Sequence, residues 1–194
     1  MLRFGDYEFK IAETVEELDQ VHGLNYRTFV QEIHQHEDSG SGVLVDKFHR
    51  KNSYIIGLRD NRLIGMISFH DQPPFSVADR LADASILAST GMKPIEVRLL
   101  AVDPEERNSV ATIALVWCLY QHVVQRGYTH LLISGVAEQE NLYTHIGFVP
   151  MGPPVGTGRA CYIPMWGTLE RIGESMGRIR HLWAKRLERQ ASAR

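Results

Sequence analysis

One short polar turn in the sequence has the residue types that bind a phosphate group. Residues 103–109 read Asp-Pro-Glu-Glu-Arg-Asn-Ser and separate an alternating strand pattern, 95–102, from a long apolar segment, 110–125. Ser109 is predicted to cap a buried helix over that apolar segment. The first turn of a helix presents backbone N–H groups and the positive end of the helix dipole. With Arg107 as an additional positive charge, the turn is predicted to bind an anion such as a phosphate.

The rest of the chain predicts strands and helices that would hold this turn in place. Asp103-Pro104 ends the strand before it, because proline cannot donate to a β-ladder and restricts the residue that precedes it. Thr14 and Glu17 form the capping-box pattern that begins a helix, and Gly23 would kink that helix or divide it in two. Further strands are predicted at 7–12, 53–58, 63–70, 130–136, 148–151 and 160–166, and a further helix at 138–146.

Three segments lie outside this regular pattern. Residues 35–52 contain a flexible polar loop. Residues 71–94 form a long connection that could hold one helix, or two short ones, over 76–87, and a connection of this length in a compact domain is usually functional or disordered. Residues 168–194 have apolar side chains at helical spacing, with positive charge accumulating toward their end. The apolar positions are Leu169, Ile172, Met176, Ile179, Trp183 and Leu187.

These segments define the expected domain organisation. We expect one domain over 1–167, with 71–94 as an insertion, followed by an amphipathic C-terminal helix over 168–194. That helix would pack on the domain or across a homodimer; the alternative is a helix that binds a membrane surface or another protein.

The composition excludes several classes of protein. Hydrophobic residues make up 44% of the chain and charged residues 23%, and the net charge is −2, so nothing favours nucleic acid or an anionic membrane as a partner. No secretory signal and no uncharged apolar stretch long enough to span a bilayer is visible. Cys118 and Cys161 are predicted to be buried, reduced thiols, which fits a cytoplasmic protein. The nine histidines show no metal-ligand spacing, and we expect no metal site.

The order of the predicted elements and the central turn resemble the GNAT superfamily of N-acetyltransferases. That family carries Val-x-Pro-x-x-Arg/Gln-x-x-Gly-x-Gly at this place, and Val102, Pro104 and Arg107 match it. Val110 and Thr112 stand where the family has its two glycines, which let the backbone approach the pyrophosphate of coenzyme A. We therefore expect either a modified pyrophosphate site, in which nearby hydroxyl groups help and bulkier side chains crowd the phosphate, or a loss of tight coenzyme A binding.

The resemblance implies a fold and a co-substrate. The expected fold class is α/β in the α+β sense: a mixed, mostly antiparallel central sheet flanked by helices, with two splayed central strands that admit a pantetheine arm, and an extra C-terminal helix. The co-substrate would be an acyl-CoA, acetyl or longer, with a backbone N–H of the central strand polarising its carbonyl group. The residues expected to contact it are Leu100, Ala101, Val102, Arg107, Asn108, Ser109, Val110, Ala111 and Thr112.

The same resemblance implies a general acid. Residues 143–148 read Tyr-Thr-His-Ile-Gly-Phe and are similar to the family's Tyr-x-x-x-Gly-Phe ending of its second cofactor-contacting helix. Tyr143 is then the acid that protonates the departing thiolate, which is reasonable for a phenol of pKa about 10 and a thiol of pKa about 8.5. The alternative is that Tyr143 is a core aromatic residue and Gly147 only a helix stop.

A general base is implied on the central strand. Glu96 lies six residues before Val102, where many family members have a glutamate that accepts the amine proton, directly or through water. Two other interpretations remain open. Glu96 could form a salt bridge with Arg98, which shares its face by the period of two, and His70, at the end of the preceding strand, could be the base.

A narrower resemblance, to the long-chain N-acyl amino acid synthase and acyl-homoserine-lactone synthase branch, rests on two further segments. The branch often carries Arg-x-Phe-x-x-Glu on its first helix, matched here by Arg27, Phe29 and Glu32, and Asp-x-x-Asp before the hairpin, matched by Asp46 with His49 in second place. Its central-strand arginine is displaced by one residue here, since Leu99 stands in its place and Arg98 precedes it. The resemblance implies that Arg27, Phe29, Glu32 and Arg98 bind the substrate.

Two classes of function follow from these resemblances. The first is an N-acyltransferase that moves an acyl group from an acyl-CoA-type thioester to a small-molecule amine, with an acyl-carrier protein as the alternative donor for a long-chain N-acyl amino acid synthase-like enzyme. The second is a non-catalytic ligand-binding or assembly protein of the same fold, with the basic C-terminal helix as its contact surface.

Overall fold

The computed structural model describes residues 1–88 and 91–177, except for the side chain of residue 159. These residues form two compact units. Unit 1 comprises residues 1–73 and 95–123, and unit 2 comprises 74–94 and the chain from 124 onward. In the described residues no helix is both long enough and apolar enough to cross a bilayer.

Unit 1 contains an antiparallel sheet of five strands. Their order is β1 (Leu2–Phe4), β2 (Tyr7–Ile11), β3 (Ser53–Arg59), β4 (Arg62–His70) and β5 (Pro94–Val102), each pairing antiparallel with the next. The hairpin between β3 and β4 turns at Asp60 and Asn61, both of which have positive φ, as a two-residue hairpin turn requires. β1 was not predicted, because three residues are too few to show a period of two.

The first helix of unit 1 changes type rather than breaking at Gly23. Thr14 and Glu17 form the predicted capping box, and α1 (Val15–Asn25) runs through Gly23 without interruption. The chain then continues as a π-helix, η1 (Tyr26–Glu32), in which the N–H of Ile33 bonds the Thr28 carbonyl 2.9 Å away. The chain thus forms two successive helices, as one of the two alternatives expected, but the change falls at Tyr26 rather than at Gly23. The absence of a side chain there instead leaves room for Arg27, whose guanidinium lies against that position.

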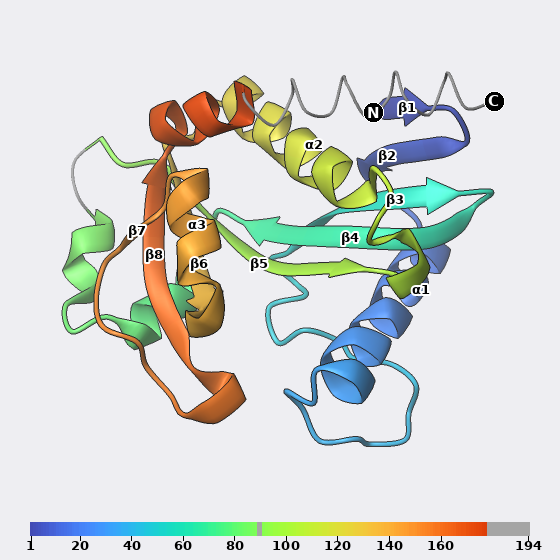
Figure 1. Cartoon of the computed structure of the whole chain (residues 1–194), viewed down its shortest axis with the longest axis horizontal. Helices are drawn as coiled ribbons and strands as arrows, with labels where there is room; N and C mark the ends of the chain where they lie inside the picture. Colours follow the sequence, from blue (N-terminus) through green and yellow to red (C-terminus); the bar gives the residue numbers. More distant parts are fainter. Residues whose placement is uncertain (89–90, 178–194) are drawn as a thin grey trace. The chain divides into compact units, whose positions relative to one another are not determined.

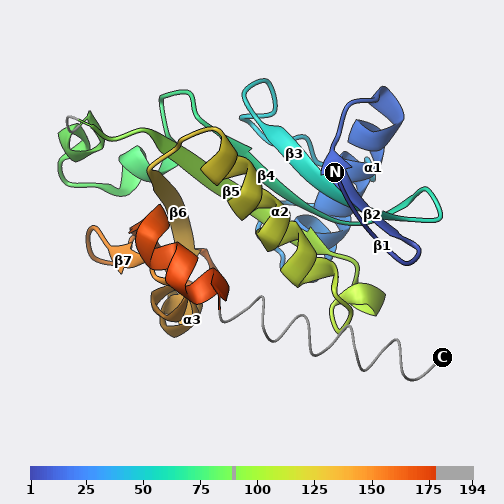
Figure 2. The same ribbon diagram turned by 90° about the horizontal axis from the view of Figure 1, so that it is seen from above.

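Helices cover both faces of the unit 1 sheet. Figures 1 and 2 show α1 on one face and α2 (Ala111–Gln125) on the other. On the α1 face, Val21 and Leu24 join a core with Ile56 and Met66 of the strands. On the other face, the buried side of α2 lies so close to β4 that a Cβ at Gly65 would meet Leu115 at 3.0 Å. The helix ends two residues before Gly127, which has the positive φ expected of a stop.

Unit 2 contains a smaller antiparallel sheet. β8 (Tyr162–Thr168) pairs with β6 (His130–Val136) on one side and with β7 (Val149–Pro150) on the other. Its helices are η2 (Ser76–Arg80), η3 (Ala84–Ala88), η5 (Ala137–Gln139), α3 (Glu140–Ile146), η6 (Gly158–Ala160) and residues 169–177. The short helices expected within 71–94 are confirmed as η2 and η3.

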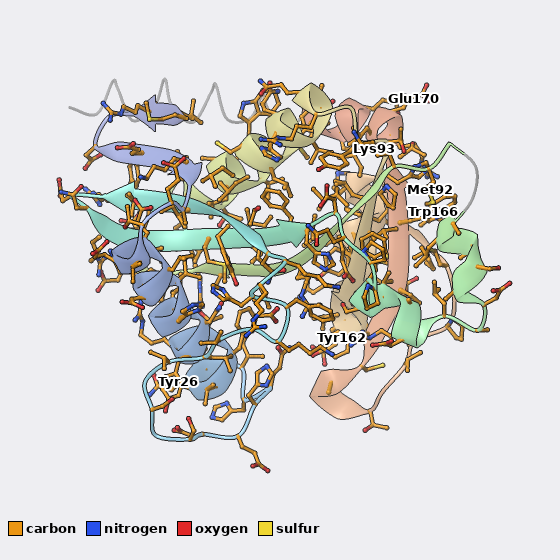
Figure 3. All side chains as sticks on the ribbon, turned by 180° about the vertical axis from the view of Figure 1, so that it is seen from behind. Tyr26, Met92, Lys93, Tyr162, Trp166 and Glu170 are labelled. Carbon is orange, nitrogen blue, oxygen red and sulfur yellow. The ribbon has the colours of Figure 1, made fainter. Side chains whose placement is uncertain are left out.

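The connection 74–94 contributes to the core of unit 2. Phe75 and Val77 pack with Leu132 of β6, and Met92 and Trp166, both labelled in Figure 3, pack against them. Lys93 binds across to the chain before β6, where its backbone N–H donates to Thr129 Oγ1 at 2.8 Å. In the described residues this segment is therefore an ordered part of unit 2.

The predicted fold class is confirmed, since the chain is a mixed α/β protein with antiparallel pairing and flanking helices. The splay predicted between strands 95–102 and 130–136 concerns strands of different units and stays a prediction, as does the division at residue 167. The C-terminal helix is helical over 169–177, with Ile172 and Met176 buried. Its positions Ile179, Trp183 and Leu187 lie outside the described residues.

Candidate functional site

A β-bulge in β5 determines where the candidate side chains of unit 1 point. Ile67 of β4 pairs with Leu100, but Phe69 pairs with Val97, so β5 has one extra residue between these two pairs. The N–H of Leu99 within the bulge donates to Ser68 Oγ at 3.1 Å. A bulge shifts the alternation of side chains by one residue. The argument from a period of two, which put Glu96 and Arg98 on one face, therefore does not hold across it.

Glu96 and His70 form a buried pair at the far end of these strands. The two residues are directly opposite each other in the register of β4 and β5. Their closest atoms, Glu96 Oε2 and His70 Nε2, are 3.0 Å apart, and the side chains are 1% and 0% exposed. A buried carboxylate is costly without a partner. Glu96 thus contacts His70, the residue that we predicted as the alternative base.

Phe48 links this pair to Arg98. Its ring stacks on the His70 ring, with centroids 5.5 Å apart and planes at 17°. The Arg98 guanidinium carbon lies 4.3 Å from the Phe48 centroid, and Lys47 Nζ and Lys51 Nζ lie 5.0 and 5.5 Å from it. An aromatic face attracts cations through its quadrupole. Phe48 therefore gathers positive charge beside a buried acid–imidazole pair.

Asp46 holds the other side of Arg98. Its Oδ2 accepts from Arg98 Nη2 at 2.9 Å, and its Oδ1 accepts from the N–H of Phe48 at 2.8 Å and from Asn52 Nδ2 at 3.0 Å. Burial disfavours the charged carboxylate, but the Arg98 hydrogen bond and charge outweigh it and hold the pKa of Asp46 below its usual value. The loop 46–52 is thereby fixed to the central strand.

Arg107, predicted to bind pyrophosphate, is engaged by another predicted site residue. Its Nη1 and Nη2 donate to the two carboxylate oxygens of Glu32 at 2.6 and 2.5 Å, and its Nε donates to the Val102 carbonyl at 3.1 Å. The π-helix ends at Glu32, and such turns recur at functional sites. The hydrogen bond from Arg107 lowers the pKa of Glu32 against a smaller opposing effect of burial. Both side chains remain about two-fifths exposed, at 41% and 42%.

The rest of the turn is partly satisfied by its own side chains. Ser109 Oγ donates to the Glu106 carbonyl at 2.7 Å and accepts from the N–H of Ala111 at 3.1 Å. Ser109 thus acts just before the helix, which begins at Ala111 rather than at 110. Val110 is fully buried. The crowding expected from Val110 and Thr112 concerns a bound phosphate and stays a prediction.

The remaining predicted contacts of unit 1 differ widely in exposure. Phe29 belongs to the hydrophobic core, whereas Arg27 is exposed on the helix surface beside Gly23. Ala101 and Val102 are buried, and Leu100 is exposed on the same strand. Asn108 is exposed and Thr112 half-buried. Their roles in binding stay predictions.

Tyr143 lies in unit 2, on α3. Its ring lies directly over Gly135 of β6, where a Cβ would come within 2.7 Å of two ring carbons. α3 ends at Gly147, whose φ of 115° and closeness to the Arg171 backbone both require glycine. Burial raises the pKa of Tyr143, and a hydrogen bond with the Val136 backbone partly opposes that rise. The phenol is therefore kept protonated at neutral pH, as a general acid requires.

Sequence reasoning underestimated two residues, His70 and Phe48. The position of His70 opposite Glu96 could have been inferred by extending the predicted hairpin register into the next strand. Phe48 carries a weaker signal: an aromatic residue directly after one lysine and three residues before another. In the described residues no group of three or more His, Cys, Asp or Glu side chains is placed to hold a metal ion.

Comparison with known proteins identifies relatives of the chain. A family model described as N-acyl amino acid synthase FeeM matches residues 20–165. Among solved structures, FeeM, an N-acyl amino acid synthase from uncultured soil microbes, superposes with a TM-score of 0.67 at 17% identity, covering 90% of this chain and 97% of that one.

Two further structures share the fold. BjaI, a CoA-dependent acyl-homoserine lactone synthase, matches with a TM-score of 0.67 at 18% identity, over 85% of this chain and 82% of its own. ElaA from Escherichia coli matches with a TM-score of 0.59 at 15% identity, over 83% and 99%. No curated protein matches the chain by sequence.

Proposed function

The chain belongs to the N-acyl amino acid synthase FeeM family and is an N-acyltransferase with a GNAT-type fold, and on that basis we propose that it transfers an acyl group from coenzyme A to the amine of an amino acid. The observation that carries the proposal is the buried Glu96 carboxylate, placed at the start of the central strand next to an imidazole. A carboxylate in that position can accept the proton that an amine loses when it attacks a thioester.

The transfer needs one proton removed and one supplied. The amine nitrogen attacks the thioester carbonyl carbon, a C–N bond forms, the C–S bond breaks, and the nitrogen gives its proton to Glu96. The departing thiolate takes a proton from the Tyr143 hydroxyl, which returns to its protonated state through solvent. Burial keeps the pKa of Tyr143 above its ordinary value, so the phenol holds its proton at neutral pH until the thiolate leaves.

The turn before α2 is the proposed place for the donor's phosphates. The start of α2 offers backbone N–H groups and the positive end of the helix dipole to an anion. The half-exposed pair between Arg107 and Glu32 is exchangeable, since a phosphate can replace the Glu32 carboxylate in the bidentate geometry that arginine favours. We propose that the donor makes this exchange when it binds.

The acceptor is proposed from the family, which is that of an N-acyl amino acid synthase. An amino acid carries a carboxylate beside its amine, and the cations gathered on Phe48 lie near the Glu96–His70 pair within unit 1. A positive patch beside the base would orient such a zwitterion with its amine toward Glu96.

The experiment is a thiol-release assay with acetyl-, octanoyl- and palmitoyl-CoA against a panel of the twenty amino acids, with the product identified by mass spectrometry. We expect an N-acyl amino acid, and a turnover number reduced about 10–100-fold in Tyr143→Phe, the range of a lost general acid. Tyr120→Phe, on the partly exposed side of α2, is the matched control. Full activity of Tyr143→Phe would remove Tyr143 from the mechanism.

A carrier-protein donor is the alternative. The favouring observation is again the Arg107–Glu32 pair, which neutralises the one arginine of the turn in the absence of donor. If no acyl-CoA binds by calorimetry but palmitoyl-carrier protein yields product, the donor is the carrier protein. If neither yields product with any amino acid, the proposed reaction is wrong.

A further inference from the structure

The described buried groups of unit 1 include one carboxylate and one imidazole that touch. Glu96 Oε2 and His70 Nε2 are 3.0 Å apart and both side chains are essentially inaccessible to solvent. In such a site a charge on one group is stabilised when the other group carries the opposite charge.

We propose that His70 and Glu96 act as a single proton acceptor, and that Phe48 is the positioning residue that holds the His70 ring in place. The inference rests on the proposed function and deepens it by naming where the amine proton is stored. The proton leaves the amine nitrogen for the Glu96 carboxylate and is then held on the His70 ring. The C–N bond formed and the C–S bond broken are those of the acyl transfer, and no other reactant is needed.

A carboxylate alone is poorly suited to accept the amine proton at neutral pH. A carboxylate in water is a weak base, with an ordinary pKa of about 4.3, whereas a general base works best near the operating pH. An imidazole accepts a proton in that range. Before proton uptake the pair carries one negative charge, and afterwards it is a neutral ion pair. The buried site therefore becomes better balanced as the proton arrives.

The surroundings of His70 fit this storage role. Glu96 faces the ring from β5, and Phe48 stacks on it from the loop 46–52 with planes at 17°. The charged groups beyond Phe48 are Arg98, Lys47 and Lys51 on its ring, and Asp46 on Arg98. The stack restricts rotation of the imidazole, so that Nε2 stays within 3.0 Å of Glu96 Oε2. On the far side of Phe48, Asp46 compensates one of the cations.

The first test does not depend on activity. In protein labelled with ¹³C at the histidine ring carbons, the pH titration of the His70 ring is followed by NMR in the parent and in Glu96→Gln. We expect the pH dependence of the His70 ring signals to differ between the two proteins, because the carboxylate charge beside the ring has been removed. His122, which contacts Phe69 in the same unit, is the internal control, and its signals should not differ. The same pH dependence of the His70 signals in both proteins would overturn the proposal.

The second test measures turnover as a function of pH. His70→Gln keeps the size and polarity of the side chain but cannot store a proton, and we expect kcat to fall about 100-fold with KM for the acyl-CoA unchanged. His122→Gln is the matched control. Phe48→Leu should lower kcat by a smaller factor and Phe48→Tyr should restore it. If His70→Gln is fully active, His70 takes no part in accepting the proton. The proposal of a paired acceptor is then wrong, even if Glu96 alone is the base.

The two tests separate this inference from the proposed function. A difference in the His70 signals between the parent and Glu96→Gln, in a protein with no turnover, would leave the coupled pair intact and reject the acyl transfer. Turnover in a protein whose His70 signals are the same in the parent and in Glu96→Gln would support the acyl transfer and reject the coupled pair.

Discussion

Unit 1 holds two pairs, each of a carboxylate and a nitrogen-bearing side chain, that are similar in distance and differ in burial. Glu96 and His70 are 1% and 0% exposed, and Glu32 and Arg107 are 42% and 41% exposed. Both pairs have atoms 3.0 Å apart or closer, and both involve residues predicted from sequence to have a role in the reaction. The comparison shows that distance alone does not tell what a pair can do.

Burial decides between storage of a proton and exchange of a ligand. In the inaccessible pair the low dielectric couples the two charges strongly, so that a proton added to one is felt by the other. In the half-exposed pair water screens the attraction, and such pairs contribute little to stability. A phosphate can therefore displace Glu32 at small cost, whereas separating Glu96 from His70 would remove the imidazole from beside a buried carboxylate.

The largest effect is expected from removing the buried charge. Glu96→Gln should lower kcat about 10²–10⁴-fold, the range of a lost general base, measured as thiol release under saturating acyl-CoA. The control is Glu105→Gln, because Glu105 is 81% exposed in the turn and pairs only loosely with Arg62 at 3.6 Å. Equal activity of the two variants would remove the distinction between the buried and the exposed carboxylates.

A third pair, Asp46–Arg98, is intermediate in burial between the other two. Its contribution to the free energy of unfolding can be measured. Its side chains are 10% and 12% exposed, and Asp46 accepts three hydrogen bonds. Asp46→Asn should lower the free energy of unfolding by about 3 kcal/mol, because Arg98 is left without its counter-charge. Urea unfolding measures the loss, with the exposed Asp79→Asn as control. A change below about 0.5 kcal/mol, the range of surface substitutions, would mean that solvent reaches this pair freely.

The pH dependence of stability follows from the same carboxylate. The folded pKa of Asp46 is held below its unfolded value of about 3.9, so its contribution is complete above that value and is lost as the pH falls through the folded pKa. We expect the free energy of unfolding of the parent to fall between about pH 5 and pH 2 more steeply than that of Asp46→Asn. Parallel curves for the two proteins would contradict the assignment.

The smallest effect on stability is expected at the exposed pair. Glu32→Gln should change the free energy of unfolding by less than about 1 kcal/mol. The same variant should bind coenzyme A several-fold more tightly, because Arg107 no longer has to leave a carboxylate, and the gain should shrink as salt is added. Isothermal titration at two salt concentrations measures both, with Glu37→Gln in the exposed loop as control. Weaker binding in Glu32→Gln would show that Glu32 positions Arg107 rather than competing for it.

Local sequence patterns were sufficient for most of the fold. The capping box at Thr14, the turn at Asp60-Asn61 and the stops at Gly127 and Gly147 each depend on a few adjacent residues, and each is present in the structure. The motif around Arg107 and the alternating strand before it likewise predicted the GNAT-type fold with its central strand and helix. Short-range backbone preferences and apolar periodicity are encoded locally, so they can be read directly from sequence.

Which side chains contact one another was decided only by tertiary structure. The bulge between Val97 and Leu100 shifts the alternation of side chains by one position, and no local sequence pattern predicts it. The contacts of Glu96 with His70 and of Arg107 with Glu32 join residues 26 and 75 positions apart, because strand pairing and helix packing bring them together. Sequence thus determined which residues carry charge and on which elements they lie, while burial and pairing, which set what each charge does, arose from the packing of those elements.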